Sequence, residues 1–412
     1  MSEAPCLREQ ADFASHLQCG KVAIQMADLS TQSTPAPAAA VPAKPASHRL
    51  VSLDAFRGIT MMLMVLVNDG GGPGGYHALQ HSPWNDWTLT DTVFPSFLWI
   101  VGVAITLSLG KRLSEGADRR RLTAQIFKRS VILYAFGLLI YAFPHFDLST
   151  QRILGVLQRI AICYFICSLI YMTTSLRGQL IWIGSLLTAY WMLMTLVPVP
   201  GYGPGHLDVA GNFAHYIDRI VLGGHNYAST KTWDPEGIVS TLPAIVTTLL
   251  GIMAGHILRL RRTLAERTTW LFLTGSLLLA AGMICNIWLP INKHLWSDSF
   301  ALFMAGLDFI VFAIFVWCVD GLGYKRIVKP LVIMGMNAIT IYMVSELLAT
   351  VLSTIHVTSG ESNISLHHWI FATIFAPLAS PANSSLLYAL AYTGLMYVLA
   401  YALYRKRWFL KV

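Results

Sequence analysis

The sequence predicts an all-α integral membrane protein, a polytopic helical bundle that crosses a bilayer about ten times. Apolar residues make up 55% of its 412 residues and charged residues only 12%, whereas soluble domains carry roughly 25% charged residues. Apolar runs of about 20 residues, the length that spans a bilayer, recur along the chain. Lys and Arg lie in short clusters between these runs, a pattern that encodes membrane orientation.

Residues 1–48 differ in composition from the rest of the chain. The stretch from Ser30 to Ser47 is rich in Pro and Ala and has no apolar periodicity, which predicts a disordered leader. It also lacks the apolar core and cleavage site of a signal peptide. We therefore expect a disordered cytoplasmic leader at 1–48 and one transmembrane domain at 49–412.

Ten apolar runs have the length of membrane spans. They lie at 53–69, 91–110, 126–143, 153–173, 179–197, 239–258, 269–289, 299–319, 328–349 and 385–404. Segment 366–378 is apolar but too short to cross, so it is expected to be re-entrant or interfacial.

The distribution of basic residues predicts the orientation of these spans. Basic clusters lie at 111–129, 259–267, 324–329 and 405–411, all on one side of a ten-span bundle. The other side offers mainly Arg152, Arg219, Lys231 and Lys293. The positive-inside rule then places both termini in the cytoplasm and the protein in the inner (plasma) membrane. It also accounts for the net charge of +8 without nucleic-acid binding.

Several other classes of chemistry lack support in the sequence. The histidines do not have the spacing of a metal site, and there is no P-loop, HExxH motif or dinucleotide fingerprint. Cys163 and Cys167 share a helix face inside an apolar run and are expected to be buried, inert thiols. We therefore predict an enzyme or transporter with no metal and no disulfide framework.

The first loop on the outer side carries the strongest candidate site. It reads NDGGGPGGYHALQHSPWNDWTLTD, and its glycines predict irregular backbone beside a membrane end, which is tolerated where it lines a watery cavity. His77 and His81 lie near the carboxylate of Asp91 and the amide of Asn68. A histidine oriented by such a group can deprotonate an amine. The alternative is a tight surface turn with solvated histidines.

Four polar residues in or near the apolar runs are candidates for contact with a ligand. Arg57 follows Asp54 at i, i+3, which suits either an ion pair or a phosphate-binding Arg. Gln158 and Arg159 lie inside the fourth run, where a charge marks a functional site by default. Asn337, like Asp308 and Glu346 elsewhere in the apolar runs, could instead join helices through hydrogen bonds.

The connection from Pro198 to Gly237 is the longest loop and is expected to form an ordered cover over the outer side. Asp234 and Glu236 end it, either as site residues or as caps of the next helix. Tryptophans of the outer loops, among them Trp84 and Trp296, are expected to be interfacial aromatics or walls of a site.

Several segments, taken in order, resemble the heparan-alpha-glucosaminide N-acetyltransferase family of transmembrane acyltransferases. They are RLVSLDAFRGITMMLMVLVND, HSPWNDWTLTDTVFPSFLWIVGVAI, GVLQRIAICYF, WDPEGIVSTLPAIVTTLLGIMAG, NKHLWSDSFALFMAGL and MGMNAITIYMVSEL, and the resemblance covers 49–412. It implies that acetyl-CoA enters from the cytosol and that an amino sugar on the far side is acetylated. The family's catalytic histidine corresponds to His81 of HSPWN, its asparagine to Asn68, and its intramembrane pair to Gln158 and Arg159.

The resemblance and the residues together give one mechanistic hypothesis. His81, oriented by Asp91, deprotonates the acceptor amine or carries the acetyl group itself, and Asn68 donates a hydrogen bond to the oxyanion. The cofactor, acetyl-CoA, is expected to contact Arg57, Gln158, Arg159 and Asn337. The acceptor is expected to contact Trp84, Asp234, Glu236 and Trp296.

The expected acceptor is a cell-envelope glycan or another amino sugar, because the long lumenal N-terminal domain of the lysosomal members is not evident. The sequence is compatible with a homodimer. The alternative function is a secondary transporter in which Arg159 and Glu346 line the path. Transporters usually show internal repeats with matching broken helices, and the sequence shows no such symmetry.

Overall fold

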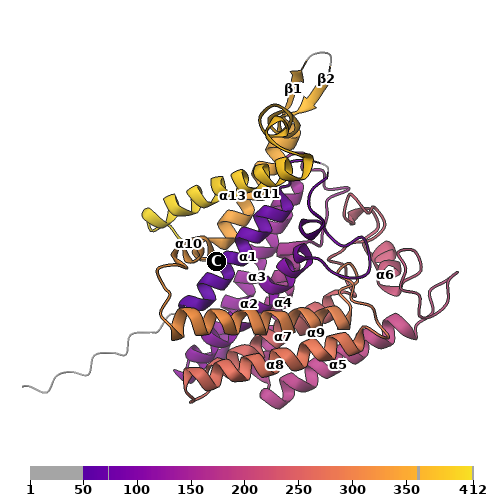
Figure 1. Ribbon diagram of the computed structural model, residues 1–412. Coiled ribbons are helices and arrows are strands. Elements are labelled where there is room, and N and C mark those ends of the chain that lie inside the picture. The colour runs from indigo at the N-terminus through magenta and orange to yellow at the C-terminus, as the bar shows by residue number, and fades with distance from the viewer. Residues whose placement is uncertain (1–49, 73, 360–361, 411–412) are drawn as a thin grey trace, which may run out of the picture. The chain divides into compact units, whose positions relative to one another are not determined.

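The computed structural model describes residues 50–72, 74–359 and 362–410, and these form an all-α bundle as predicted (Figure 1). The leader predicted for 1–48 lies outside the described residues. Eight described helices are long and apolar enough to cross a membrane. They are α1 (Val51–Asn68), α2 (Leu89–Ser114), α3 (Arg119–Ala142), α4 (Val156–Thr173), α7 (Thr241–Leu258), α8 (Leu264–Cys285), α9 (Asp298–Phe315, extended by the π-helical turn η3, Val316–Gly321) and α13 (Pro381–Arg405).

A ninth span is broken in its middle. Helices α10 (Lys329–Met336) and α11 (Ala338–Thr354) meet at Asn337 with a bend of 75°. The remaining predicted span, 179–197, falls on α5 (Leu176–Thr195), a helix of 20 residues that is not among those eight. Arg177 and Gln179 near its start lower its hydropathy. Its exposed Leu180, Ile181 and Met192 suit a lipid-facing surface.

The centre of the bundle depends on close backbone contact between α2 and α7. A Cβ atom at Gly102 would lie 2.0 Å from the carbonyl oxygen of Thr248, and one at Gly251 would lie 2.0 Å from that of Trp99. Small residues bring membrane helices together in this way because lipid gives no hydrophobic force between them. Beside this contact, Cys163 and Cys167 are buried free thiols, as predicted.

Two connections on the α1 C-terminal side are long and ordered. The first loop, residues 69–88, contains the 3₁₀ turn η1 (His77–Leu79). The long loop, residues 196–240, is built around α6 (Phe213–Val221) and η2 (Gly223–His225). The Asp218 carboxylate of α6 accepts the backbone N–H of Ile238 at 3.0 Å, which ties the end of this loop to its helix.

A β-hairpin and a short apolar helical segment follow α11. Strands β1 (His356–Ser359) and β2 (Ser362–Ser365) pair antiparallel, and the hairpin projects from the neighbouring helices at the top of Figure 1. Segment 366–378 then forms α12 (Leu366–Ile370), the π turn η4 (Phe371–Phe375) and the 3₁₀ turn η5 (Ala376–Leu378). It is a short apolar helical segment rather than a full span, as its length predicts.

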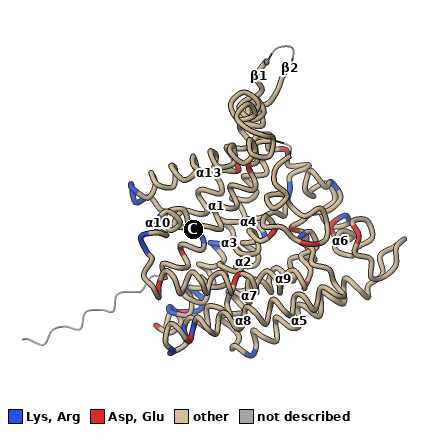
Figure 2. Tube along the Cα trace, viewed as in Figure 1, with Lys and Arg blue, Asp and Glu red and all other residues tan. Residues whose placement is uncertain are grey.

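The charges predict a topology that reporter fusions can test. Figure 2 shows long uncharged stretches along the helices, with Lys and Arg gathered mainly in loops and near helix ends. A reporter fused after Val412 is expected to read cytoplasmic, and one inserted at the exposed Gly224 of η2 is expected to read exterior. Matching sides for the two reporters would contradict the odd number of spans, five, that the prediction places between Gly224 and the C-terminus.

Candidate functional site

The start of α2 orders His81 through Asp91. Thr88 caps this helix, and the Oδ2 atom of Asp91 accepts the backbone N–H groups of Ser82 and Thr88 at 3.0 and 3.1 Å. The other oxygen, Oδ1, lies 2.7 Å from His81 Nδ1. An acceptor-only carboxylate at that distance requires the proton on Nδ1. The lone pair of His81 therefore lies on Nε2, on a ring that is 48% exposed.

Lys293 reaches the same histidine from the 286–297 loop between α8 and α9. Its Nζ lies 2.9 Å from His81 Nδ1, 3.3 Å from His81 Nε2 and 3.5 Å from Asp91 Oδ1. The two loops are held together because Asp86 donates its N–H to the carbonyl of Ile291 at 2.9 Å. Sequence reasoning treated Lys293 only as an outer-side charge, although the NKHLWSDS segment contained it.

His77 and Asn68 occupy different surroundings from His81. His77 begins η1 with an exposed side chain. Asn68, the last residue of α1, donates its side-chain N–H to Glu346 Oε1 of α11 at 3.0 Å. Asp308 of α9 accepts a hydrogen bond of 2.5 Å from the Ser96 hydroxyl of α2. It therefore joins two helices through a hydrogen bond, which is one of the two alternatives from the sequence.

Two cavities lie along α1. The larger, of about 450 Å³, is lined by Arg57, Met61 and Met64 of this helix, and its volume is within the range of small-molecule sites. It brings together the predicted cofactor residues Arg57 and Asn337, and its other lining residues include Met61, Met64, Arg129, Leu157 and Tyr342. The smaller cavity, of about 280 Å³, lies between the first loop and the start of α13, and its lining includes Tyr76, His81, Thr90 and Ser385.

Gln158 and Arg159 are fully buried beside the larger cavity. Their neighbours Leu157 and Ile160 line it, but they themselves do not. Arg159 donates to the carbonyl of Gly237 at 3.0 Å and to the Ser240 hydroxyl at 2.5 Å. Among the described residues, no hydrogen-bond partner reaches the side-chain amide of Gln158.

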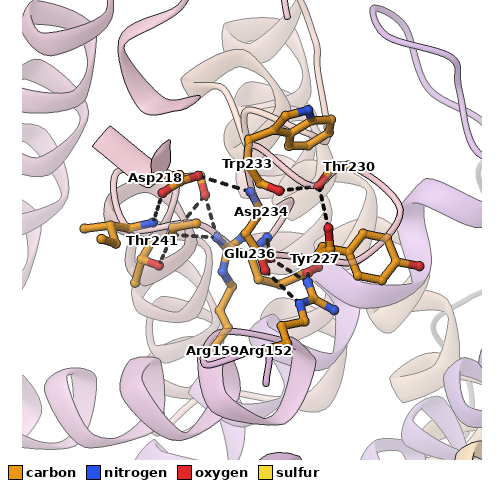
Figure 3. A network of polar contacts seen from close by, with 12 residues as sticks. Arg152, Arg159, Asp218, Tyr227, Thr230, Trp233, Asp234, Glu236 and Thr241 are labelled. Atoms are coloured by element: carbon orange, nitrogen blue, oxygen red, sulfur yellow. Dashed lines mark hydrogen bonds and ion pairs between the residues drawn. The ribbon is translucent and has the colours of Figure 1, made fainter. Parts of the chain in front are cut away.

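Asp234 and Glu236 form a buried network with Arg152 (Figure 3). Arg152 donates to the two oxygens of Asp234 at 2.7 and 2.6 Å and also to Glu236. Its guanidinium also lies 4.4 Å from the ring centre of Tyr227. Against the effect of burial, the two carboxylates raise the pKa of Arg152. The capping alternative for Asp234 and Glu236 is wrong, because Ser240 is the N-cap of α7.

Aromatic and imidazole rings join the long loop to the other two loops. Trp233 of the long loop stacks on His215 at 4.1 Å and lies edge-on to Trp84 of the first loop at 6.0 Å and to His294 of the 286–297 loop at 5.5 Å. Trp84 in turn stacks on His294 with ring centres 5.6 Å apart. Burial lowers the pKa of His215 to about 3, so its ring stays neutral. Trp84 is partly exposed and can serve as a wall of a site.

Trp296 lies deeper than Trp84. It is 1% exposed and donates its indole N–H to Thr247 at 3.2 Å, while the Arg159 guanidinium lies 5.1 Å from its ring. The structure therefore places Trp296 with Arg159 and away from solvent. No cluster of three or more metal-ligating side chains occurs in the described ranges.

Comparison with known proteins links the chain to one family. A family model described as "Heparan-alpha-glucosaminide N-acetyltransferase, catalytic" matches residues 49–283. Heparan-alpha-glucosaminide N-acetyltransferase of Mus musculus is 30% identical over 420 residues, which cover 89% of this chain and 61% of the mouse protein. The protein of the same name from Homo sapiens is 32% identical over 353 residues, covering 72% and 53%. The chain thus spans less than two thirds of the length of either relative.

Proposed function

Because the chain belongs to the heparan-alpha-glucosaminide N-acetyltransferase family, we propose that it transfers an acetyl group across the membrane. The donor is acetyl-CoA on the cytoplasmic side, and the acceptor is an amino sugar or envelope glycan on the periplasmic side. The bilayer of the inner membrane separates the two substrates.

The observation that carries this proposal is the pair of cavities along α1. Met64 lines the larger cavity and Val67 lines the smaller one, so along the helix axis they approach within about one turn, roughly 5 Å. Arg57 lies in the first cavity and His81 in the second. A short partition of this kind suits the passage of a two-carbon group between ligands that stay on their own sides.

The larger cavity fits the chemistry of acetyl-CoA. Arg57 and Arg129 supply cations for phosphate groups, and Met61, Met64 and Leu157 supply apolar wall for the pantetheine arm. Asn337 lines the cavity at the bend between α10 and α11. Gln158 and Arg159 are proposed to act at its inner end, where Leu157 and Ile160 of the same helix form the lining.

The smaller cavity suits the acceptor. His81 Nε2 takes a proton from the acceptor nitrogen, while Asp91 holds the ring and keeps the proton on Nδ1. Asn68 is proposed to donate its amide N–H to the oxyanion, which requires it to exchange its present partner, Glu346. Acetylation of His81 itself is the other route.

Trp84 offers a ring for a sugar face, and Asp234, Glu236 and Trp296 hold the long loop in place through Arg152 and Arg159.

The rival function, a secondary transporter, receives no specific support. Its architecture predicts broken helices in matching halves. The described residues contain one bent pair, at Asn337, without a counterpart earlier in the chain. Radiolabelled acetyl-CoA offered to the purified protein with a panel of amino sugars tests the proposal directly, and an active acceptor would identify the substrate class.

Acetyl-CoA is expected to raise the apparent unfolding temperature in a dose-dependent way. A ligand that binds only the folded state stabilises it by about 2.7 kcal/mol at 100 times its Kd. Ala104→Trp, which fills the larger cavity, should abolish the shift, whereas Ala382→Trp, which fills the smaller one, should keep it. Thermal-shift measurements in detergent test both. Folded wild-type protein that gives no shift at millimolar acetyl-CoA would contradict the cofactor site.

A further inference from the structure

The first turns of α13 form one wall of the smaller cavity. Ala382, Ser385, Leu386 and Ala389 line it, and their spacing of i, i+3, i+4 and i+7 places them on one side of the helix. These four residues are the α13 face. Three of the four side chains are small, so a larger one at those positions would fill part of the cavity of about 280 Å³.

Segment 366–378 holds the glycine-rich part of the first loop in place. A Cβ atom at Gly71 would lie 2.5 Å from the ring of Phe371 and 2.7 Å from Cβ of Tyr388. One at Gly72 would also lie 2.5 Å from the Phe371 ring. Contacts this short leave no room for a side chain, so the loop needs glycine at both positions to pack on Phe371.

Ser385 is the polar residue of the α13 face. It is 5% exposed, and its hydroxyl donates to the carbonyl oxygen of Gly72 at 3.4 Å. Thr90 of α2 lines the same cavity, and its hydroxyl donates to the carbonyl oxygen of Ala78 at 3.4 Å. Hydrogen bonds of this length are weak, and each hydroxyl oxygen keeps its acceptor lone pairs. The cavity thus offers two hydroxyl groups that can bind the hydroxyls of a sugar ring.

We propose that the α13 face determines which acceptor is acetylated: Ser385 binds a hydroxyl of the amino-sugar ring, and Ala382 and Ala389 leave room for the ring itself. Phe371 is the positioning residue that holds the first loop, and the catalytic histidine with it, against this face. The inference rests on the proposed acetyl transfer and adds the residues that select its acceptor. A change in the α13 face should therefore alter the fit of the acceptor without altering the base or the donor cavity.

Ala389→Leu tests the room for the ring. The kinetics are measured with glucosamine, or with galactosamine or mannosamine if either is acetylated faster. The larger side chain should lower kcat/KM for the amino sugar by roughly tenfold, mainly through KM, and the thermal shift with acetyl-CoA should persist. Ala391→Leu makes the same change at an exposed position of the same helix and should keep wild-type kinetics.

Ser385→Ala tests the hydrogen bond to the ring. It should lower kcat/KM for the amino sugar by up to roughly tenfold. Deoxy analogues, each lacking one ring hydroxyl, identify the partner: the analogue without it should lose activity with the wild-type protein but not with Ser385→Ala. A general structural defect would lower all the rates alike. Ser384→Ala removes a neighbouring hydroxyl, bound to the carbonyl of Ala379 at 2.9 Å, and should keep the wild-type order of the analogues.

The role of Phe371 is tested by complementation. Gly72→Ala should lower acetyl transfer by up to roughly 10²-fold, the cost of a misplaced reacting group, because its Cβ would meet the outer atoms of the Phe371 ring. Adding Phe371→Leu removes those atoms and should restore part of the rate. The thermal shift with acetyl-CoA shows that each variant is folded.

Two sets of results would overturn the inference in distinguishable ways. Wild-type KM in Ala389→Leu, an unchanged order of the deoxy analogues in Ser385→Ala, or no rescue of Gly72→Ala by Phe371→Leu would each contradict the role of the α13 face or of its wedge, and would leave the proposed acetyl transfer in place. Absence of acetyl transfer to every amino sugar by the wild-type protein would instead overturn the proposed function itself, and this inference with it.

Discussion

His81→Ala is expected to reduce acetyl transfer by about 10²–10⁴-fold, the usual cost of removing a general base. The structure gives the reason, because Asp91 Oδ1 lies 2.7 Å from Nδ1 and leaves Nε2 as the base. The ring lines the smaller cavity and not the larger one. The thermal shift with acetyl-CoA should therefore persist in this variant.

Two neighbouring substitutions serve as controls for His81→Ala. His77→Ala removes an exposed side chain from the same loop and should leave most of the activity. Asn68→Ala should fall between the two, since loss of one oxyanion hydrogen bond costs a few kcal/mol. Initial rates are measured at matched expression and folding. Near-normal turnover by His81→Ala, or a deeper loss of activity from His77→Ala, would show that His81 is not the catalytic base.

Arg152→Met is expected to destabilise the folded protein by about 3–5 kcal/mol, because breaking a buried ion pair leaves an unpaired charge in the interior. Arg152 is 8% exposed and pairs with both Asp234 and Glu236. Methionine keeps much of the side-chain length, so the loss comes mainly from charge. Thermal unfolding in detergent should show a large fall in Tm.

The matching controls test that explanation. Adding Asp234→Asn and Glu236→Gln to Arg152→Met removes the stranded charges and should recover much of the Tm. Arg262→Met breaks an exposed pair with Glu266, 3.7 Å apart, and should change stability by no more than about 1 kcal/mol. Equal losses from Arg152→Met and Arg262→Met would show that burial does not govern this network.

The spans and their class were predictable because the bilayer imposes a length and an apolarity on each of them. Helix α5 marks the limit of that rule, since Arg177 and Gln179 at its start reduce the apolarity of a helix of spanning length. The bend at Asn337 was not predicted, because the apolar run continues through it without a proline at the break.

The candidate site was predictable only where its parts are near in sequence. His81 and Asp91 lie ten positions apart and fell within one motif. Lys293 lies 212 positions from His81, and Arg152 lies 82 from Asp234. Both looked like isolated outer-side charges, because only tertiary packing decides which loops meet. The same reason explains why Asp234 and Glu236 suggested helix capping.

The narrow separation between the cavities at Met64 and Val67 bears on how much the protein has to move. A carrier must expose one binding site alternately to the two sides of the membrane, which requires rocking or gating of whole groups of helices. Under the proposed function, each substrate binds and leaves from its own side of the membrane, and only the acetyl group passes from one side to the other. Such an enzyme can exclude ions throughout its catalytic cycle. Cross-links that fix the helices relative to one another should therefore leave acetyl transfer intact.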